Sequence, residues 1–272
     1  MVKFNIIDQY PIRLGITDRL GGISQGPYGC MNTNFYHPDQ FQTACSDIKI
    51  AIDSLGITAK IIVATRQTHS SNLLIIDENF EFKGLKAYDV SNTDLKGYEL
   101  YSVDGTDGLI TNRNDIVLMT FYADCVPLFI YDTEKKVVAS VHSGWRGTSK
   151  RIGEVAIKML EKQYESNAES LIAGIGQSAG KCCYEVDEPV VEIFKSAFKP
   201  EQVSLLFEER GGGKYLVDLK KANQMIFNEN GLLEGSVEVK SACTICEPTR
   251  YHSHRYVNGG PRGSMSMFVQ LI

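Results

Sequence analysis

The sequence predicts an α+β fold with mixed sheets. Strand-like apolar runs outnumber the helical patterns along the 272 residues, and the two kinds of segment do not alternate regularly. A regular alternation would instead predict helices wound around a parallel sheet. Hydrophobic residues make up 43% of the chain, which is enough to form a large buried core. Because no repeat or low-complexity linker divides the chain, we expect a single domain over residues 1–272.

Each predicted strand is a β-branched or apolar run bounded by polar residues. These runs cover residues 61–69, 72–78, 107–112, 115–123, 127–132, 137–142, 170–176, 203–209, 214–219 and 264–272. Residues 211–214, with the sequence GGGK, separate two of the runs and predict a hairpin turn. The polar and irregular segment 80–101 is expected to be a long surface excursion.

Apolar residues recur at three- and four-residue spacing in the predicted helices. These helices cover residues 42–55, 148–164, 188–197 and 219–230. The second has the clearest pattern, because Ile152, Val155 and Met159 share one face and Thr148 offers an N-terminal cap.

Charge and hydropathy exclude several classes of protein. The net charge is −5, so we expect no electrostatic attraction to nucleic acid or to an anionic membrane. The N-terminus lacks the pattern of a signal peptide, and the best apolar segment, 116–123, is shorter than the roughly 20 residues of a membrane helix. We therefore expect a cytoplasmic protein that binds neither nucleic acid nor a membrane.

The counts of histidine and cysteine narrow the possible chemistry. Five His are too few for several copper centres, because each such centre needs about three imidazoles. Seven Cys is an odd number in a chain without secretory features, which argues against a disulfide framework. Reduced cysteines remain, and they can serve as core residues, metal ligands or a nucleophile.

The most informative stretch is a predicted hairpin over residues 122–147. If its turn is centred between Thr133 and Glu134, Cys125 lies directly opposite His142. Opposed residues have Cβ atoms about 4.5–5.5 Å apart, which suits either one metal ion or a thiolate–imidazolium pair. Alternatively, neither residue takes part in chemistry, so that Cys125 only fills the core and His142 is a buried, hydrogen-bonded side chain. A catalytic zinc has three protein ligands and one open position, so such a site needs a third ligand. His69 is the best candidate, because it ends a strand-like run just before a polar turn.

A rival metal site lies near the C-terminus. Cys243 and Cys246 form a CxxC pair, and His252 and His254 follow, which together supply the ligand types of a structural zinc site. The adjacent pair Cys182–Cys183 is expected in the core. The preceding segment, GIGQSAGK, departs from the phosphate-binding loop pattern and is expected to form a glycine-rich turn.

Five motifs in the middle of the chain resemble those of the YfiH/YlmD-like family, also called the laccase-domain or multicopper polyphenol oxidase family. They are QTHS (67–70), TDGLIT (106–111), ADCVPL (123–128), HSGWRG (142–147) and CCYEV (182–186). Segments similar to the family's terminal signatures are GGIS (21–24), MNTN (31–34), DLKKAN (218–223), CT (243–244), HSHR (252–255) and GGPRG (259–263). The similarity therefore runs in order over nearly the whole chain.

The resemblance implies a single catalytic domain with four layers of the α/β/β/α type, in which two mixed β-sheets are sandwiched between helices. It implies one metal site at His69, Cys125 and His142, with zinc as the cofactor and copper as the alternative. The implied activity is a purine nucleoside phosphorylase that cleaves inosine, adenosine and methylthioadenosine with phosphate. Adenosine deaminase activity is implied as well. The expected partners are therefore small molecules, a purine nucleoside and phosphate, and we expect a monomer or a homodimer.

Further residues are candidates for supporting roles in that chemistry. Asp124 is expected to act as an acid or base, or to orient a ligand. Candidates for binding substrate or phosphate are Asn32, Arg66, Arg146 and Arg262. Arg146 offers a planar cation that suits phosphate, and its structural alternative is a salt bridge. The single tryptophan, Trp145, is expected either to stack on a purine or to pack in the fold.

The chain departs from the family pattern at two places, and other activities stay open. Asp47 and Ile48 stand where the family usually has an Asn-Arg pair, and His252 and His254 stand in a motif that is usually aromatic. A second hypothesis makes Cys125 the nucleophile and His142 the base of a hydrolase that acts on amide bonds, such as those of cell-wall precursors. Copper-dependent oxidation of polyphenols at the same ligands and a binding module without catalysis are further alternatives.

Overall fold

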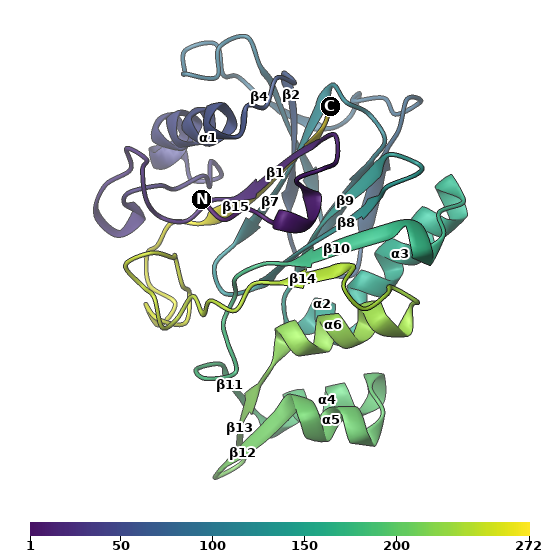
Figure 1. The fold of residues 1–272 in the computed structure, drawn as a ribbon. Helices are drawn as coiled ribbons and strands as arrows, with labels where there is room; N and C mark the ends of the chain where they lie inside the picture. Colours follow the sequence, from purple (N-terminus) through teal and green to yellow (C-terminus); the bar gives the residue numbers. More distant parts are fainter.

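Two six-stranded sheets form the middle of the molecule (Figure 1). The computed structural model describes residues 1–272. In spatial order the strands of the first sheet are β1 (Ile12–Ile16), β15 (Met265–Leu271), β7 (Ile116–Tyr122), β2 (Ile61–Arg66), β5 (Glu99–Asp104) and β4 (Lys86–Tyr88). This sheet is mixed, because β2 runs parallel to both β5 and β7 whereas β15 is antiparallel to β1 and β7.

The second sheet contains the predicted hairpin at its centre. Its inner strands pair antiparallel, and each edge strand pairs parallel with its neighbour. In spatial order the strands are β14 (Val237–Val239), β10 (Leu171–Ile175), β8 (Val126–Asp132), β9 (Val137–Ser143), β6 (Gly108–Thr111) and β3 (Leu73–Ile76). Every residue of β7, β8 and β9 is buried, which explains why these strands read as continuous apolar runs rather than as alternating patterns.

Helices cover the outer faces of both sheets. Helix α1 (Phe41–Leu55) packs on the first sheet, and α2 (Trp145–Ser149), α3 (Ile152–Tyr164) and α6 (Leu219–Glu229) cover the second. Short 3₁₀ turns occur at Asn5–Ile7, Gly26–Tyr28, Pro38–Gln40 and Ala168–Ser170. The layers are therefore helix, sheet, sheet and helix, and the predicted α+β class is confirmed. The helix expected over 148–164 is interrupted at Arg151, whose backbone is left-handed with φ 56°.

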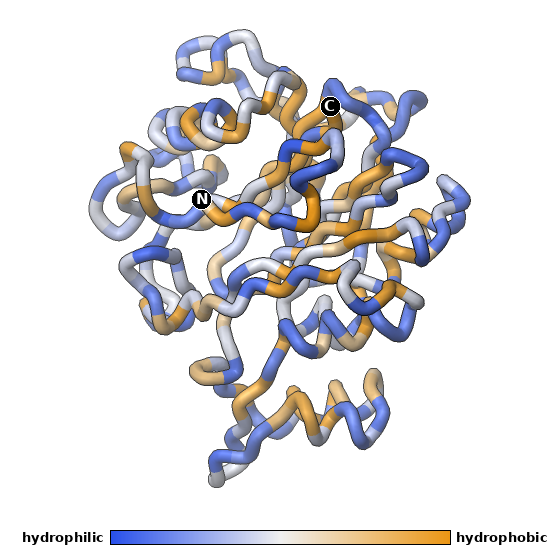
Figure 2. The backbone as a smooth tube through the Cα atoms, in the orientation of Figure 1, coloured by the Kyte–Doolittle hydropathy of each residue, from blue (hydrophilic) through white to orange (hydrophobic).

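Three buried clusters fill the spaces between these layers. One cluster lies between the two sheets, a second lies between the second sheet and its helices, and the third lies under α1. The hydropathy colouring of Figure 2 follows this division, with hydrophobic segments along the central strands and hydrophilic ones along the outer loops. Burial of each large aliphatic or aromatic side chain contributes roughly 1.5–3 kcal/mol, so these clusters dominate the stability of the fold.

A small three-stranded sheet lies beyond the helices, at the lower end of Figure 1. It consists of β11 (Glu185–Asp187), β13 (Lys214–Val217) and β12 (Phe207–Gly211), and helices α4 (Glu188–Ala197) and α5 (Pro200–Leu206) accompany it. The GGGK segment forms the turn between β12 and β13, as predicted.

The strand predicted over 203–209 is wrong in its first half, which belongs to α5. Pro200 at the first helical position has the backbone angle a helix needs, and Val203 and Leu206 are buried on one face at three-residue spacing. The surface excursion expected over 80–101 also contains β4 and the first residues of β5.

The predicted register of the β8–β9 hairpin is wrong by two residues. Pro127 lies opposite His142, and Asp132 lies opposite Val137, so the turn is centred between Glu134 and Lys135. The Asp132 carboxylate accepts hydrogen bonds from the N–H groups of Glu134 and Lys135, which fixes this later turn. Cys125 precedes β8 and is a diagonal neighbour of His142.

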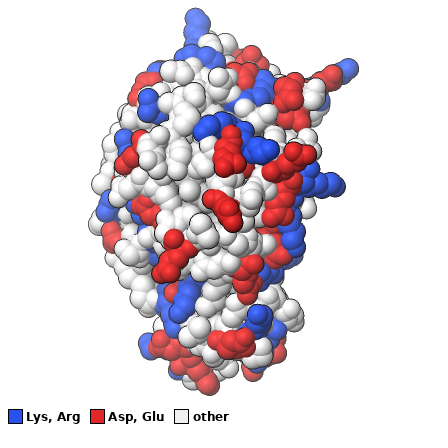
Figure 3. Space-filling view, turned by 45° about the vertical axis from the view of Figure 1, so that its right-hand side comes forward, with Lys and Arg blue, Asp and Glu red and all other residues white.

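Surface charges of both signs are interspersed on the face drawn in Figure 3. No helix of the protein is both long enough and apolar enough to span a bilayer.

Candidate metal centre and pocket

Three separate segments bring His69, Cys125 and His142 together. His69 lies in the turn after β2, Cys125 lies between β7 and β8, and His142 lies near the end of β9. Their possible ligand atoms all lie within 4.8 Å of one another. The Cys125 sulfur is 3.8 Å from Nε2 of His69, and the two imidazole rings are 5.0 Å apart between centroids. His142 is buried, whereas His69 is exposed.

Two residues at this centre have an unusual backbone conformation. His69 has φ 58° and Asp124 has φ 90°, in the left-handed region that side chains other than glycine seldom adopt. Such conformations concentrate at functional sites, where the surrounding structure holds them in place. At Asp124 that structure is visible, because its carboxylate accepts hydrogen bonds from the Thr244 hydroxyl at 2.6 Å and from the Arg255 N–H at 2.7 Å.

Asp107 organises both histidines, and the sequence analysis did not single it out. Its carboxylate lies 2.8 Å from Nδ1 of His142, which leaves Nε2 of that ring free to bind a metal. The same carboxylate accepts the backbone N–H groups of Thr68, His69 and Ser70, so it also shapes the turn that carries His69. Asp107 is fully buried just before β6, within the TDGLIT motif.

The buried charges of this centre support one another. Burial alone would raise the pKa of Asp107, but hydrogen bonds from His142 and Ser70 outweigh it and hold that pKa well below its usual range. Burial likewise opposes ionisation of Cys125, yet His142 and His69 lower the pKa of the thiol to about 6. Burial would lower the pKa of His142, but Cys125 and Asp107 raise it to about 9. The pair therefore favours thiolate and imidazolium at neutral pH.

Gly144 makes room for the centre. A methyl group at this position would lie 2.9 Å from the Cys125 sulfur and 3.0 Å from Cδ2 of His69. Gly144 has φ −73°, which any residue can adopt, so the requirement for glycine is one of space.

A pocket of about 240 Å³ opens onto the three residues. Two arginines of the sequence prediction, Arg66 and Arg262, line it, as do the aromatic residues Tyr36, Phe121 and Tyr122. The Nε atom of Arg262 is buried and has no hydrogen-bond partner. Arg66 is exposed, 3.9 Å from Asp104, with its guanidinium 5.6 Å from the centre of the Tyr36 ring.

The other two predicted substrate residues lie outside the pocket lining. Arg146 is exposed, and its guanidinium lies 4.2 Å from the centre of the Trp145 ring, which packs against the core. Asn32 is fully buried, and its side-chain oxygen accepts the N–H groups of Asn34 and Ser264. Because Asn34 and Ser264 do line the pocket, Asn32 supports its wall.

The rival ligand set of Cys243, Cys246, His252 and His254 is not brought together. Nε2 of His252 is hydrogen-bonded to the carbonyl of Met31 at 2.8 Å, and Gly263 packs against its ring. The two cysteines instead lie beside Cys182 and Cys183. The expectation that Cys182 and Cys183 are core residues is wrong, because Cys182 is exposed and Cys183 is half-buried in the loop before β11.

Asp47, the residue that departs from the family pattern, has a structural role. Its buried carboxylate accepts hydrogen bonds from the N–H groups of Ile23 and Asn32 and from the Ser24 hydroxyl, each at 2.6–2.7 Å. Helix α1 thus holds the GGIS segment and the MNTN segment, whose Asn34 lines the pocket.

Comparison with known proteins shows the family and agrees with the fold. The model of the family described as multi-copper polyphenol oxidoreductase laccase matches residues 13–272. The chain belongs to this family. Purine nucleoside phosphorylase YlmD of Bacillus subtilis (strain 168) is 31% identical over 255 residues, which cover 94% of this chain and 87% of the relative. Adenosine deaminase RL5, from an unknown prokaryotic organism, is 31% identical over 202 residues, or 74% of this chain and 72% of the relative.

A solved structure of the family has the same fold. The crystal structure of YlmD from Geobacillus stearothermophilus superimposes with a TM-score of 0.85 at 26% identity, covering 98% of this chain and 94% of that chain. The resemblance inferred from the sequence motifs is thereby confirmed. The family's description mentions several coppers, whereas the residues of this chain that surround the pocket bring together two histidines and one cysteine.

Proposed function

We propose that this protein is a zinc-dependent purine nucleoside phosphorylase that cleaves inosine, adenosine and methylthioadenosine with phosphate and also deaminates adenosine. We further propose that residues 1–272 form one catalytic domain. The observation that carries the proposal is the content of a single pocket, whose lining contains two histidines, a cysteine, two arginines and three aromatic residues. The relatives named as phosphorylases and as a deaminase support the same activities.

The three proposed ligands suit a catalytic zinc. Two imidazoles and one thiolate are a ligand set that such sites use, and a carboxylate behind one imidazole is the usual way to fix its orientation. Asp107 provides this carboxylate for His142, and it also positions the backbone at His69. When bound, zinc acts as a Lewis acid that activates water at neutral pH, which is the chemistry that deamination needs.

The remaining pocket residues suit a nucleoside and phosphate. We assign phosphate to Arg262 and Arg66, because a guanidinium binds phosphate oxygens through paired hydrogen bonds and the Arg262 Nε has no partner within the protein. We assign the purine to Tyr36 and Phe121, whose rings offer a surface for stacking.

We propose that Asp124 positions Cys125 rather than exchanging protons. Its two carboxylate oxygens are already used by Thr244 and Arg255, and it immediately precedes the proposed ligand. Asn32 has a similar supporting role behind Asn34 and Ser264.

The activity is tested by incubating the purified protein with inosine, with and without phosphate, and by measuring hypoxanthine and ribose 1-phosphate. We expect both products only when phosphate is present. The variant Cys125→Ala should lose the activity, whereas Cys30→Ala, which changes an exposed cysteine elsewhere, should keep it. Absence of hypoxanthine at every phosphate concentration would refute the proposal.

A second candidate is a Cys–His hydrolase, which the mutual stabilisation of the Cys125 thiolate and the His142 imidazolium favours. Such an enzyme should keep its activity after treatment with a strong chelator and lose it on alkylation of Cys125. The proposed phosphorylase should instead lose activity with the chelator and regain it with zinc. Restoration by copper alone, together with oxidation of phenols, would point to the polyphenol oxidase alternative.

A further inference from the structure

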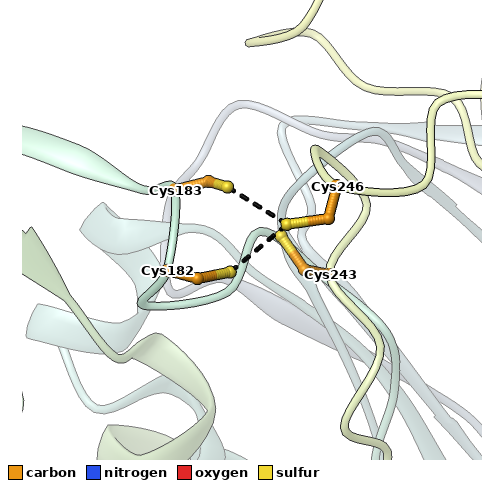
Figure 4. Close-up of side chains that lie close together, drawn as sticks. All are labelled: Cys182, Cys183, Cys243 and Cys246. Carbon is orange, nitrogen blue, oxygen red and sulfur yellow. Dashed lines mark hydrogen bonds between the residues drawn. The ribbon is translucent and has the colours of Figure 1, made fainter.

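A second group of possible metal ligands lies outside the pocket, and the proposed activity does not use it. Cys182 and Cys183 come from the loop between β10 and β11, and Cys243 and Cys246 come from the loop after β14. Their four sulfur atoms all lie within 4.8 Å of one another. Figure 4 shows the two pairs of side chains pointing toward each other across the gap between the loops.

We propose that Cys182, Cys183, Cys243 and Cys246 bind a structural zinc ion as four thiolates. Tetrahedral zinc with Zn–S distances of about 2.3 Å places its sulfurs about 3.8 Å apart. The Cys246 sulfur lies 3.5 Å from that of Cys182 and 3.2 Å from that of Cys183, so small side-chain adjustments reach this arrangement. A disulfide, with a bond of about 2.05 Å, would join only two of the sulfurs and leave the others clustered without a role.

The surroundings of the cluster offer a hydrogen bond and positive charge to metal-bound sulfur. The N–H of Gly180 donates a hydrogen bond to the Cys243 sulfur at 3.2 Å, as backbone amides do around metal-bound sulfur. Four thiolates around Zn²⁺ carry a net charge of −2, which needs cations nearby. Lys220 is 8% exposed, makes no salt bridge, and donates from Nζ to the carbonyls of Ser241 and Ala242. Residues Lys181, Lys220, Lys221 and Lys240 all line the adjoining cavity of about 500 Å³.

The proposed zinc would join the two loops that hold Asp124. Ser178 and Cys243 form a parallel bridge, and the Ala179 N–H donates to the Asp124 carbonyl at 2.9 Å. From the other loop, the Thr244 hydroxyl donates to the Asp124 carboxylate at 2.6 Å. Because Asp124 adjoins Cys125, the four cysteines would fix the position of the candidate metal centre from outside the pocket.

Metal analysis of the protein, purified under reducing conditions without added metal, tests this site. We expect about two zinc ions per chain in the unchanged protein, and about one in Cys246→Ser and in Cys125→Ser. The double variant should contain none, and Cys30→Ser, a matched exposed cysteine, should keep both. The zinc content therefore shows which of the two proposed sites is absent, because each single variant removes the zinc of one site only.

A second measurement, X-ray absorption at the zinc edge, uses the Cys125→Ser variant, which retains all four cysteines of the proposed site. Its result therefore does not depend on how well the Cys246→Ser variant folds. We expect four sulfur neighbours at about 2.3 Å and no nitrogen neighbour. Zinc that is absent from Cys125→Ser, or that has nitrogen or oxygen ligands, would overturn the proposal. A disulfide between the two loops, found by peptide mass spectrometry of freshly isolated protein, would also overturn it.

Discussion

At the residue scale, one buried carboxylate holds the candidate metal centre together. Asp107 binds the His142 ring and the backbone of the turn that carries His69, so it acts on two of the three proposed ligands. Sequence reasoning selected the ligands from their residue types and motifs. It missed Asp107, because a carboxylate after a polar turn looks the same whether it faces solvent or a histidine. Its place beside a strand in TDGLIT was the available signal.

The variant Asp107→Asn should weaken zinc binding at the centre of His69, Cys125 and His142 about 10- to 100-fold. This is the usual effect of removing a carboxylate behind a ligand histidine. Competition with a fluorescent chelator measures the change. Asp115→Asn removes an exposed carboxylate that is paired with Arg113, and it should leave zinc affinity unchanged. Equal affinities for all three proteins would show that Asp107 does not orient the centre.

The variant Gly144→Ala should also weaken zinc binding, because the added methyl group would press on Cys125 and His69. The neighbouring Gly147→Ala is the control, since a methyl group there meets nothing closer than 3.4 Å. The same chelator competition compares the two. Loss of zinc affinity in both variants would indicate a general disturbance of α2 rather than a steric limit at Gly144.

The variant Arg262→Gln should raise the KM for phosphate about tenfold or more, because a charge-assisted hydrogen bond contributes about 1.5–3 kcal/mol. The KM for inosine should change less. Steady-state kinetics with either substrate varied separates the two effects, and Arg210→Gln, at an exposed arginine of β12, is the control. A larger change in the KM for inosine would assign Arg262 to the nucleoside instead.

At the scale of elements, the sequence predicted most strands and helices, and its errors have local physical causes. The predicted register of the β8–β9 hairpin was wrong because Asp132 caps a turn centred between Glu134 and Lys135. This centre is one residue later than the predicted one, between Thr133 and Glu134. Helix α5 was missed because the apolar run at 203–206 is too short to distinguish the strand repeat of two residues from the helix repeat of 3.6 residues. Short strands such as β4 and β14 carry no pattern of their own and form only by pairing with longer ones.

One prediction belongs to helix α1 and the loops that it holds. Replacing Asp47 by Ala should lower the free energy of unfolding by about 3 kcal/mol or more, since each buried donor left without its acceptor costs about 1–3 kcal/mol. The exposed Asp53→Ala, which removes an ion pair with Lys49 on the same helix, should cost about 0.5 kcal/mol or less. Urea unfolding followed by circular dichroism measures both, and similar losses would contradict the role given to Asp47.

At the scale of the whole molecule, the two sheets bring the proposed ligands together. The first sheet carries His69 after β2, and the second carries His142 in β9. Cys125 lies in the connection from β7 to β8, which joins the two sheets, so the centre forms where the sheets meet. Motifs along the chain could predict which residues take part. They could not predict that the loops after β10 and β14 bring four cysteines together, because the two cysteine pairs are about 60 residues apart and no local pattern relates them.

The central claim is that His69, Cys125 and His142 hold the catalytic metal, and anomalous X-ray diffraction tests it most directly. Crystals of protein purified without added metal would be measured on both sides of the zinc absorption edge. We predict an anomalous peak between Nε2 of His69, the Cys125 sulfur and Nε2 of His142 that vanishes below the edge. No peak at this position in catalytically active protein would contradict the account.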